Sequence, residues 1–248
     1  MTSSLFHTLN ISKQDMMTRL LDLDVVSNNL ANMNTSGFKS SRSNFQELLG
    51  KAIQRDGIKT SSTQGLMQQG ALKQSTIATD WAIQGEGFFQ VKLADGKTAY
   101  TRDGEFSVDA NRQLVTASGA RLVWSGTIPD GYTDLSVRTD GTVDATMQDG
   151  TVRTLGTVQL ARFNNPTGLK ENGNNNWLET VPSGAPIVAA PGTTNMGTVN
   201  THQVEQSNVD ISREMTQLMV DQRSFQMSVK AFQQTDQMIQ EALSLRKA

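Results

Sequence analysis

Apolar residues recur at helical spacing near the start of the chain. A step of seven residues separates Leu9, Met16, Leu23 and Leu30. Leu20 lies four residues after Met16 and three before Leu23. A repeat of seven with offsets of three and four is typical of a coiled-coil-like helix. The pattern predicts an N-terminal helix over residues 1–36.

The C-terminal end shows the same periodicity over a longer stretch. Steps of four and three connect Ile211, Met215, Leu218, Phe225, Val229, Phe232, Ile239 and Leu243, with Gln222 and Asp236 as the two polar interruptions. Asp210 is a candidate N-cap. A helix from about 209 to 245 would be roughly 50 Å long. Helices of this length usually pair along their length, although folding back over the core of its own domain stays an alternative.

Between the two ends the pattern changes to short β-type runs separated by turn pairs. The hairpin signals are Asp95-Gly96, Asp103-Gly104, Asp140-Gly141 and Asp149-Gly150. We therefore expect an antiparallel all-β domain over 81–200. Residues 37–80 are rich in polar residues and predict an extended linker with at most short strands.

The expected fold class is α+β. Its two terminal helices, over 1–36 and 201–248, form a discontinuous, coiled-coil-like module that brackets the central antiparallel β domain.

Composition excludes several functions. The chain has no cysteine, two histidines and a net charge of −2. This excludes thiol chemistry and disulfides and leaves little for a zinc site. The near-balance of charge argues against nucleic acid as a partner. The longest apolar runs are too short for membrane insertion, and the first residues do not resemble a cleaved signal peptide.

Motifs for catalysis are equally sparse. The glycines of Gly85-Glu86-Gly87 begin like a dinucleotide fingerprint, but Gln90 occupies the third glycine position, so a strand preceded by a turn or bulge is the better interpretation. Asp103 and Glu105 are typical of exposed turn acids. We expect no catalytic residue, no cofactor and no metal.

Four blocks of sequence resemble one family. They are "NNLANMNTSGFKSSRSNFQELL" from Asn28, "WAIQGEGFFQV" with "AYTRDGEFSVD" from Trp81, "FNNPTGLKENGNNNWLETVPSGAP" from Phe163, and "SNVDISREMTQLMVDQRSFQMSVKAFQQTDQMI" from Ser207. In this order they resemble the bacterial flagellar axial proteins, the rod, hook and hook-associated subunits. Among these the chain is most similar to basal-body rod proteins of the distal-rod type.

Two departures keep the subtype open. Arg112 stands where the family commonly has glycine, so its turn is expected to adopt another type. The stretch between Leu49 and Trp81 is also short for a distal-rod subunit. A proximal or otherwise specialised rod subunit therefore stays an alternative.

The resemblance implies a structural subunit that polymerises into a tubular drive shaft. It implies that the terminal helices form the inner tube, transmit torque and enclose an export channel. The implied partners are copies of the same chain, other rod and hook subunits, the bushing-ring proteins and the flagellar type III export apparatus. It places the chain in the basal body outside the cytoplasmic membrane, exported without a cleaved signal.

The assembly interface is expected to combine the apolar stripes with asparagines. Its candidate residues are Leu9, Met16, Leu20, Leu23, Asn28, Asn29, Leu30, Asn32, Ile211, Met215, Leu218, Phe225, Val229, Phe232, Ile239 and Leu243. The asparagine amides would bond to neighbouring subunits, or would cap and turn within one chain; Asn32 or Asn34 would take the left-handed conformation that ends the helix. The resemblance also implies that the last helix lines the channel, with Gln226, Gln233, Gln237 and Gln240 as candidates.

A different class of function stays open. The β domain could be an adhesin or carbohydrate-binding module on a coiled-coil stalk, with a glycan bound at Trp177.

Overall fold

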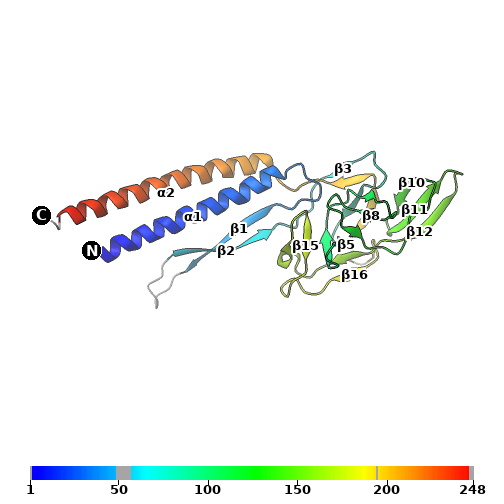
Figure 1. Cartoon of the computed structure of the whole chain (residues 1–248), viewed down its shortest axis with the longest axis horizontal. Coiled ribbons are helices and arrows are strands. Elements are labelled where there is room, and N and C mark those ends of the chain that lie inside the picture. Colours follow the sequence, from blue (N-terminus) through cyan, green and yellow to red (C-terminus); the bar gives the residue numbers. More distant parts are fainter. Residues whose placement is uncertain (1, 49–56, 194, 246–248) are drawn as a thin grey trace. The chain divides into compact units, whose positions relative to one another are not determined.

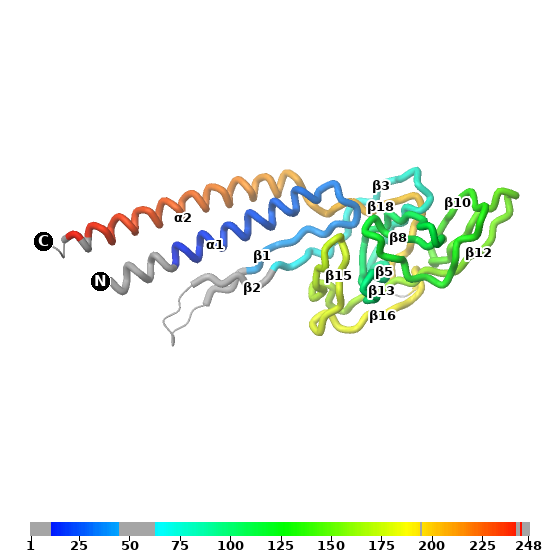
Figure 2. The backbone as a smooth tube through the Cα atoms, in the orientation of Figure 1, coloured from blue at the N-terminus to red at the C-terminus, as the bar shows by residue number. Residues whose placement is uncertain are grey.

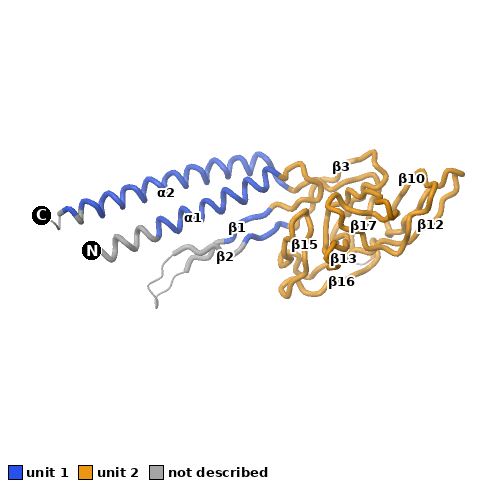
Figure 3. Tube along the Cα trace, in the orientation of Figure 1, with its two compact units in different colours: residues 1–31, 41–66, 209–248 blue, residues 32–40, 67–208 orange. Residues whose placement is uncertain are grey.

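The structure, a computed structural model, describes residues 2–48, 57–193 and 195–245. The chain divides into two compact units, each built from separate stretches of sequence (Figure 3). Unit 1 comprises residues 1–31, 41–66 and 209–248, and unit 2 comprises residues 32–40 and 67–208. The predicted α+β class, with terminal helices and an antiparallel β region between them, is confirmed.

Unit 1 is built on two long helices. Helix α1 (Thr2–Ala31) and helix α2 (Ile211–Leu245) pack side by side, and both chain termini lie at the same end of the pair, so the helices are antiparallel (Figures 1 and 2). Asp210 caps α2 as expected, because its Oδ1 accepts the backbone N–H of Ser212 at 2.9 Å. Helix α1 ends at Ala31, five residues before the predicted limit of 36.

The expected linker contains a hairpin of unit 1. Strand β1 (Ser41–Leu48) pairs antiparallel with β2 (Gly57–Gly65), and both lie against α1. The expectation of short strands at most is wrong for this stretch. Polar cross-strand contacts replace the alternation of apolar residues that usually marks a strand: Asn44 Nδ2 and Arg42 Nη2 both donate to Gln64 Oε1, at 3.0 and 3.1 Å.

Unit 2 contains the β domain. Its largest sheet has the order β14-β15-β6-β5-β9-β8-β7, and β13 pairs with both β5 and β16. The strands of this sheet are β5 (Phe88–Lys92), β6 (Thr98–Thr101), β7 (Ser107–Val108), β8 (Leu114–Val115), β9 (Arg121–Leu122), β13 (Leu160–Arg162), β14 (Lys170–Glu171), β15 (Asn176–Leu178) and β16 (Ile187–Ala189). A 3₁₀ turn, η1 (Pro166–Gly168), precedes β14.

Smaller sheets complete unit 2. A three-stranded meander contains β10 (Tyr132–Val137), β11 (Thr142–Met147) and β12 (Val152–Thr157). Strand β4 (Trp81–Gln84) pairs with β17 (Thr198–Thr201), and β3 (Leu72–Gln74) pairs with β18 (Gln203–Glu205). Strand β18 lies within 201–248, which the sequence predicted as helix. The C-terminal boundary of the β unit is therefore later than expected.

Three of the predicted hairpin turns are present. Asp95-Gly96 connects β5 to β6, Asp140-Gly141 connects β10 to β11, and Asp149-Gly150 connects β11 to β12. Asp103-Gly104 does not form a hairpin, because β6 and β7 pair with other strands. Gly104 is needed for close packing, because a Cβ at this position would lie 1.6 Å from the Trp81 carbonyl oxygen.

Arg112 retains a backbone conformation that normally favours glycine. Its φ is 58°, and its N–H donates to the Asp109 carbonyl oxygen at 2.9 Å. The expectation of another turn type is therefore wrong. Asp109 Oδ1 accepts the backbone N–H groups of Asn111 and Gln113, and these bonds hold the turn.

The core of unit 2 contains packed aromatic rings among aliphatic side chains. Trp81 and Phe89 are fully buried, and both pack edge-to-face on Phe106 at 5.7 and 5.3 Å between ring centroids.

The turn and strand expected around Gly85-Glu86-Gly87 are confirmed, since both glycines have positive φ and lead into β5. Trp177 lies in a second core cluster with an exposed fraction of 5%. A buried indole cannot stack on a sugar, so the expected glycan site at Trp177 is wrong.

Candidate assembly surface

The contact face between α1 and α2 carries polar side chains at every seventh residue. On α1 these are Asp15, Asp22 and Asn29, and on α2 they are Glu214, Asp221 and Ser228. Asn29 Nδ2 donates to Glu214 Oε2 at 3.2 Å, and Ser228 Oγ donates to Asp15 Oδ2. Moving seven residues back along α1 and seven forward along α2 leads from the first pair to Asp22 and Asp221, and then to the second pair. We call these three pairs the polar layers of the helix pair.

The middle layer brings two carboxylates together. Asp22 is 8% exposed and Asp221 is 1% exposed. Burial raises the pKa of Asp22, and the charges of Asp221 and Asp15 raise it further, against the opposing effects of the Ser43 hydroxyl and Arg19. Arg19 Nη1 lies 3.6 Å from Asp22 Oδ2.

Asn29 shows what one of the asparagines does. Its side chain is almost fully buried, its Oδ1 accepts the Ser41 N–H, and its Nδ2 donates to the Ser41 carbonyl oxygen, both at 2.9 Å. With the bond to Glu214, one amide connects α1, the start of β1 and the first turn of α2 within a single chain. Asn29 was expected at the interface between subunits, but its bonds are made inside the chain. The alternative of an internal role applies here.

The other asparagines behave differently. Asn28 is exposed on α1, and Asn32 is half-buried with its Oδ1 accepting the Thr35 hydroxyl at 3.3 Å. The expected left-handed conformation at Asn32 or Asn34 is wrong, because neither has a positive φ. Gly37, with φ of 69°, provides it a few residues later.

Large apolar side chains remain exposed on both helices. The largest exposed fractions belong to Met17 (58%), Leu20 (46%) and Leu21 (43%) on α1, and to Ile211 (46%), Met215 (49%), Met219 (53%), Val220 (50%), Met227 (64%) and Met238 (58%) on α2. We call these nine residues the exposed apolar set. Unit 1 therefore leaves much of its apolar surface without cover within the described chain.

The predicted interface residues divide into three groups. Leu20, Asn28, Ile211 and Met215 are exposed, while Met16, Leu23, Leu30, Asn32, Leu218, Phe225, Val229, Phe232 and Ile239 are partly buried. The side chains of Leu9 and Leu243 lie outside the described part. The exposed residues Met17, Leu21, Met219, Val220, Met227 and Met238 were missed, because a strict heptad assigns them to the outer face of the helices.

The candidate channel residues share one face of α2. Gln226, Gln233, Gln237 and Gln240 follow one another at steps of seven, four and three, which align on a helix, and all four are exposed.

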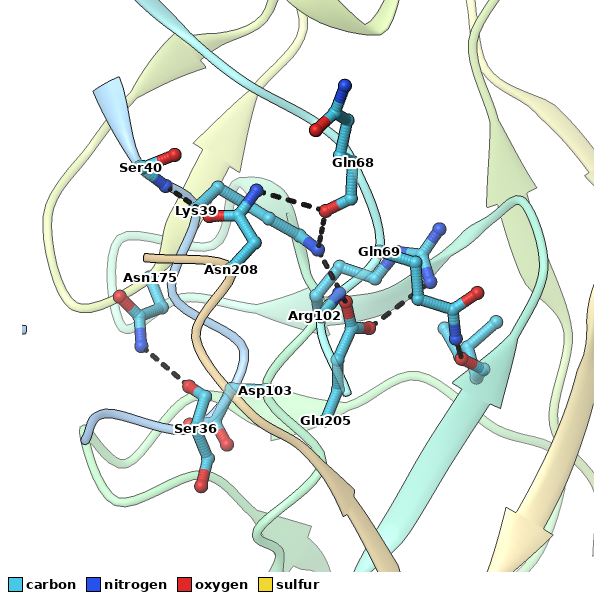
Figure 4. A network of polar contacts seen from close by, with 12 residues as sticks. Ser36, Lys39, Ser40, Gln68, Gln69, Arg102, Asp103, Asn175, Glu205 and Asn208 are labelled. Atoms are coloured by element: carbon cyan, nitrogen blue, oxygen red, sulfur yellow. Dashed lines mark hydrogen bonds and ion pairs between the residues drawn. The ribbon is translucent and has the colours of Figure 1, made fainter. Parts of the chain in front are cut away.

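Unit 2 contains a buried ionic cluster that the sequence did not reveal (Figure 4). The Glu205 carboxylate pairs with Lys39 Nζ and, at 3.3 Å, with Arg102 Nη1, and all three side chains are at most 6% exposed. Glu205 Oε1 also accepts the Gly70 N–H at 2.9 Å, and Lys39 Nζ donates to the Gln68 carbonyl oxygen at 2.7 Å. Burial lowers the pKa of both Lys39 and Arg102, against the opposing charge of Glu205.

The ionic cluster holds two chain segments inside unit 2. Lys39 belongs to the segment that follows α1, and Glu205 to the segment that precedes α2. Further bonds join the same segments: Ser40 N–H donates to Asn208 Oδ1 at 2.7 Å, and Asn208 Nδ2 donates to the Gln68 carbonyl oxygen at 3.1 Å. Lys39 lies within the first family block, but a lysine beside polar residues gives no signal of burial.

The described residues include no group of three or more acidic or histidine side chains placed to hold a metal. Among the helices described, neither has a stretch of the length and hydropathy that a bilayer requires.

Comparison with known proteins gives consistent results along the chain. Residues 14–39 match the profile described as flagella basal body rod protein, and residues 82–145 match the flagellar hook protein FlgE/F/G D1 domain. Residues 201–245 match the C-terminal region of the flagellar basal body rod FlgEFG proteins.

Whole-length relatives agree with these profiles. The flagellar basal-body rod protein FlgG of Caulobacter vibrioides is 38% identical, covering 96% of this chain and 98% of its own length. That of Buchnera aphidicola subsp. Acyrthosiphon pisum is 36% identical, covering 96% and 99%. The flagellar hook protein FlgE of Helicobacter mustelae is 40% identical over 42% of this chain and 27% of its own length. The chain therefore belongs to the family of flagellar basal-body rod proteins, a family of structural proteins.

Proposed function

We propose that the chain polymerises through α1 and α2 into the tubular shaft of the basal-body rod, where it transmits torque and encloses an export channel. The observation that carries this proposal is the exposed apolar set on both helices of unit 1. Apolar side chains gathered on two adjacent helices are typical of an interaction surface. Rod proteins of this family share both helices, so further copies of this chain and other rod and hook subunits are the proposed occupants.

The energy available at this surface is comparable with the cost of association. Covering a half-exposed large apolar side chain contributes about 1 kcal/mol, roughly half the value for full burial. The nine residues of the exposed apolar set together approach the roughly 4 to 15 kcal/mol that association costs in lost freedom of motion. Methionine provides five of the nine residues, four of them on α2, and its flexible side chain adapts to neighbours that are not identical.

We also propose that α1 and α2 gain part of their helix only during assembly. Single amphipathic helices are marginal in water, and the contact face of this pair includes polar layers in place of apolar ones. Circular dichroism of the dilute free subunit should show less helix than the assembled protein. A free subunit with the full helix content of the polymer contradicts this step.

The assembly surface can be tested with a double substitution. Met219→Gln with Met227→Gln keeps helix propensity and removes apolar surface. We expect the concentration needed for polymerisation, measured by sedimentation and electron microscopy, to rise at least tenfold, the factor that about 1.4 kcal/mol corresponds to.

A matched control removes apolar surface elsewhere. Val181 and Ile187 are exposed in unit 2, at 97% and 43%. Val181→Gln with Ile187→Gln should leave polymerisation unchanged. Equal effects of the two double variants would refute an assembly surface located on the helices.

Substitutions of the asparagines can distinguish bonds within one subunit from contacts between subunits. Asn29→Ala should weaken the helix pair of the free subunit, because it leaves the Ser41 backbone groups and Glu214 without their partner. We propose that Asn28 and Asn32 face neighbouring subunits. Asn28→Ala should therefore impair polymerisation, measured by sedimentation.

We further propose that Gln226, Gln233, Gln237 and Gln240 line the export channel with uncharged, wettable side chains. Gln226→Leu with Gln233→Leu should reduce export of later filament subunits from motile cells. Gln234→Leu, on another face of α2, is the control. Normal export in the double variant contradicts a channel position.

The family supports a place for the chain in the flagellar basal body. We propose that this place is the distal part of the rod, outside the cytoplasmic membrane, and that the type III export apparatus and the bushing-ring proteins are partners. Fractionation of tagged protein from cells with and without an active export apparatus tests the route: loss of the tag from the basal body in export mutants is the expected result.

A further inference from the structure

Among the ion pairs of the described residues, the middle polar layer takes part in one, between Arg19 and Asp22. Asp22 and Asp221 face each other between α1 and α2, and both are more than nine-tenths buried. Gln217 Nε2 donates to both carboxylate oxygens of Asp221 at 3.1 Å, and the Ser43 hydroxyl donates to Asp22. These donors satisfy oxygen atoms but bring no positive charge.

The charged groups around this layer leave it acidic. Asp15 and Arg19 of α1 and Asp221 of α2 act on Asp22, and the described part of β1 contributes the uncharged Ser43. Arg19 lies 3.6 Å from Asp22 and 3.7 Å from Asp15, so it is shared between two carboxylates on its own helix. Of the described charged groups that act on Asp22, one is a cation and two are carboxylates. Like charges in a poorly solvated place repel more strongly than the same charges in water.

Apolar residues would be usual at the positions of Asp22 and Asp221. Heptad positions at the contact between two helices are usually apolar, and a polar residue there fixes the register at a cost in stability. The flanking layers are favourable, since Asn29 bonds to Glu214 and Ser228 to Asp15. The outer layers thus set the register, and the middle layer opposes pairing.

We propose that the Asp22–Asp221 layer is a repulsive element that keeps α1 and α2 weakly paired in the free subunit. The helices can then adjust until neighbouring subunits cover the exposed apolar set. The role in assembly rests on the proposed function, but the repulsion itself is a property of the free subunit. Acid should strengthen the pair, because protonation of either carboxyl removes the repulsion.

The direction of the pH effect follows from the raised pKa of Asp22. The folded pair binds a proton more readily than the unfolded chain, in which the Asp22 carboxyl has its ordinary pKa of 3.8. The penalty is fully present above the raised pKa and is relieved as the pH falls towards 3.8. Helix content should therefore rise as the pH is lowered from 7.5 towards 3.8.

The test uses the full chain at a dilution where sedimentation shows monomer. Both α-helices of the described residues lie in unit 1, so the helical circular dichroism signal reports on this unit. Asp22→Asn and Asp221→Asn keep the shape of the side chain and one acceptor oxygen for the Ser43 or Gln217 donor, while they remove the charge. Each should raise the midpoint of thermal helix loss at pH 7.5 by about 4 °C or more. The double variant should lose the strengthening in acid.

Two matched controls remove an acid from the same helices without touching the layer. Asp24 on α1 and Asp236 on α2 are exposed. Asp24→Asn and Asp236→Asn should leave the midpoint and its pH dependence unchanged. If the wild-type subunit has too little helix to melt, the double variant should restore a helical signal at pH 7.5.

Two results would overturn the proposal. One is a midpoint for Asp22→Asn and Asp221→Asn that is equal to or below that of the wild type. The other is an equal rise in the two controls, which would indicate a general effect of net charge. Neither depends on polymerisation, which the Met219 and Met227 double variant tests separately.

Discussion

The two units of this protein bury opposite kinds of side chain. In unit 2 the most buried large residues are Trp81, Phe89 and Leu135, and the buried carboxylate of Glu205 has two cationic partners. In unit 1 the most buried side chains include Asn29 and Asp221, and methionines lie on the outside. Unit 2 therefore has an apolar core and a paired buried charge, which are the features of a stable domain. Unit 1 has buried polar residues and exposed apolar ones, which are the features of a surface that binds a partner.

Spectroscopy can follow each unit separately. All three tryptophans, Trp81, Trp124 and Trp177, belong to unit 2. Both α-helices of the described residues belong to unit 1. Tryptophan fluorescence therefore reports on unit 2, and helical circular dichroism reports on unit 1. Substitutions in unit 2 should change the fluorescence transition.

The largest expected effect comes from Glu205. Glu205→Gln leaves Lys39 and Arg102 as buried cations without a counter-ion. Breaking a buried ion pair from one side costs about 3–5 kcal/mol. We expect the free energy of unfolding of unit 2, measured by tryptophan fluorescence in urea, to fall by that amount.

Glu171→Gln, on the exposed strand β14, is the control for Glu205 and should change the free energy of unfolding very little. A Glu205→Gln protein as stable as the wild type would show that the ionic cluster does not stabilise unit 2, and the contrast between the units would lose its main support.

Gly37→Ala should have the next largest effect. The glycine has φ of 69°, and a Cβ would lie 2.4 Å from the Asp103 backbone nitrogen. Gly96 also has positive φ, at 83°, but a Cβ there would meet nothing within 4 Å. The left-handed conformation alone costs roughly 1–2 kcal/mol, so Gly37→Ala should exceed Gly96→Ala in lost stability by the cost of the clash. Urea unfolding of both variants measures the difference, and equal losses would contradict the close approach.

Sequence patterns predicted the local structure of this protein but not its long-range contacts. The heptads and the Asp-Gly pairs reflect local spacing, and they correctly predicted the helices, three hairpins and the fold class. The Lys39–Glu205 pair joins residues far apart in the chain, and polar sequence around Lys39 gives no sign of its burial. The hairpin of β1 and β2 was missed for a related reason: its polar side chains pair across strands, so the apolar alternation that marks a strand is absent.

The assembly surface was predictable only in part. A heptad indicates which side of a helix is apolar, but it does not say whether a partner from the same chain or from another chain covers that side. Leu20 and Met215 were assigned to the interface and are exposed, whereas Asn29 was assigned there and is bonded internally. Only the three-dimensional pairing of α1 with α2 separates these cases.

A pH effect of intermediate size is expected in unit 2. Burial raises the pKa of Asp103 to about 6, and the charges of Glu105 and Asp80 add to the rise. The folded state then binds the proton more tightly than the unfolded chain, so stability increases as the pH falls from 7.5 through 6 towards 3.8. We expect a gain on the order of 1 kcal/mol between pH 7.5 and 5, detected by fluorescence.

Asp103→Asn should flatten this pH dependence without affecting the response of the helical signal to acid. If the fluorescence transition keeps its pH dependence in the variant, another group is responsible.

The smallest expected effect is a gain in stability at Arg112. Its φ of 58° is unfavourable for a side chain with a Cβ, and glycine adopts this conformation freely. The one ion pair lost, Arg112 Nη2 to Asp130 Oδ1 at 2.5 Å, joins two exposed side chains and so contributes little. Arg112→Gly should therefore raise the free energy of unfolding of unit 2 by about 0.5 kcal/mol, the balance between relieved strain and the greater entropy of unfolded glycine. Arg112→Ala loses the same ion pair but keeps the strain, so it should fall slightly below the wild type in urea unfolding. A glycine variant no more stable than the alanine variant would mean that the Asp109 turn imposes no strain on Arg112.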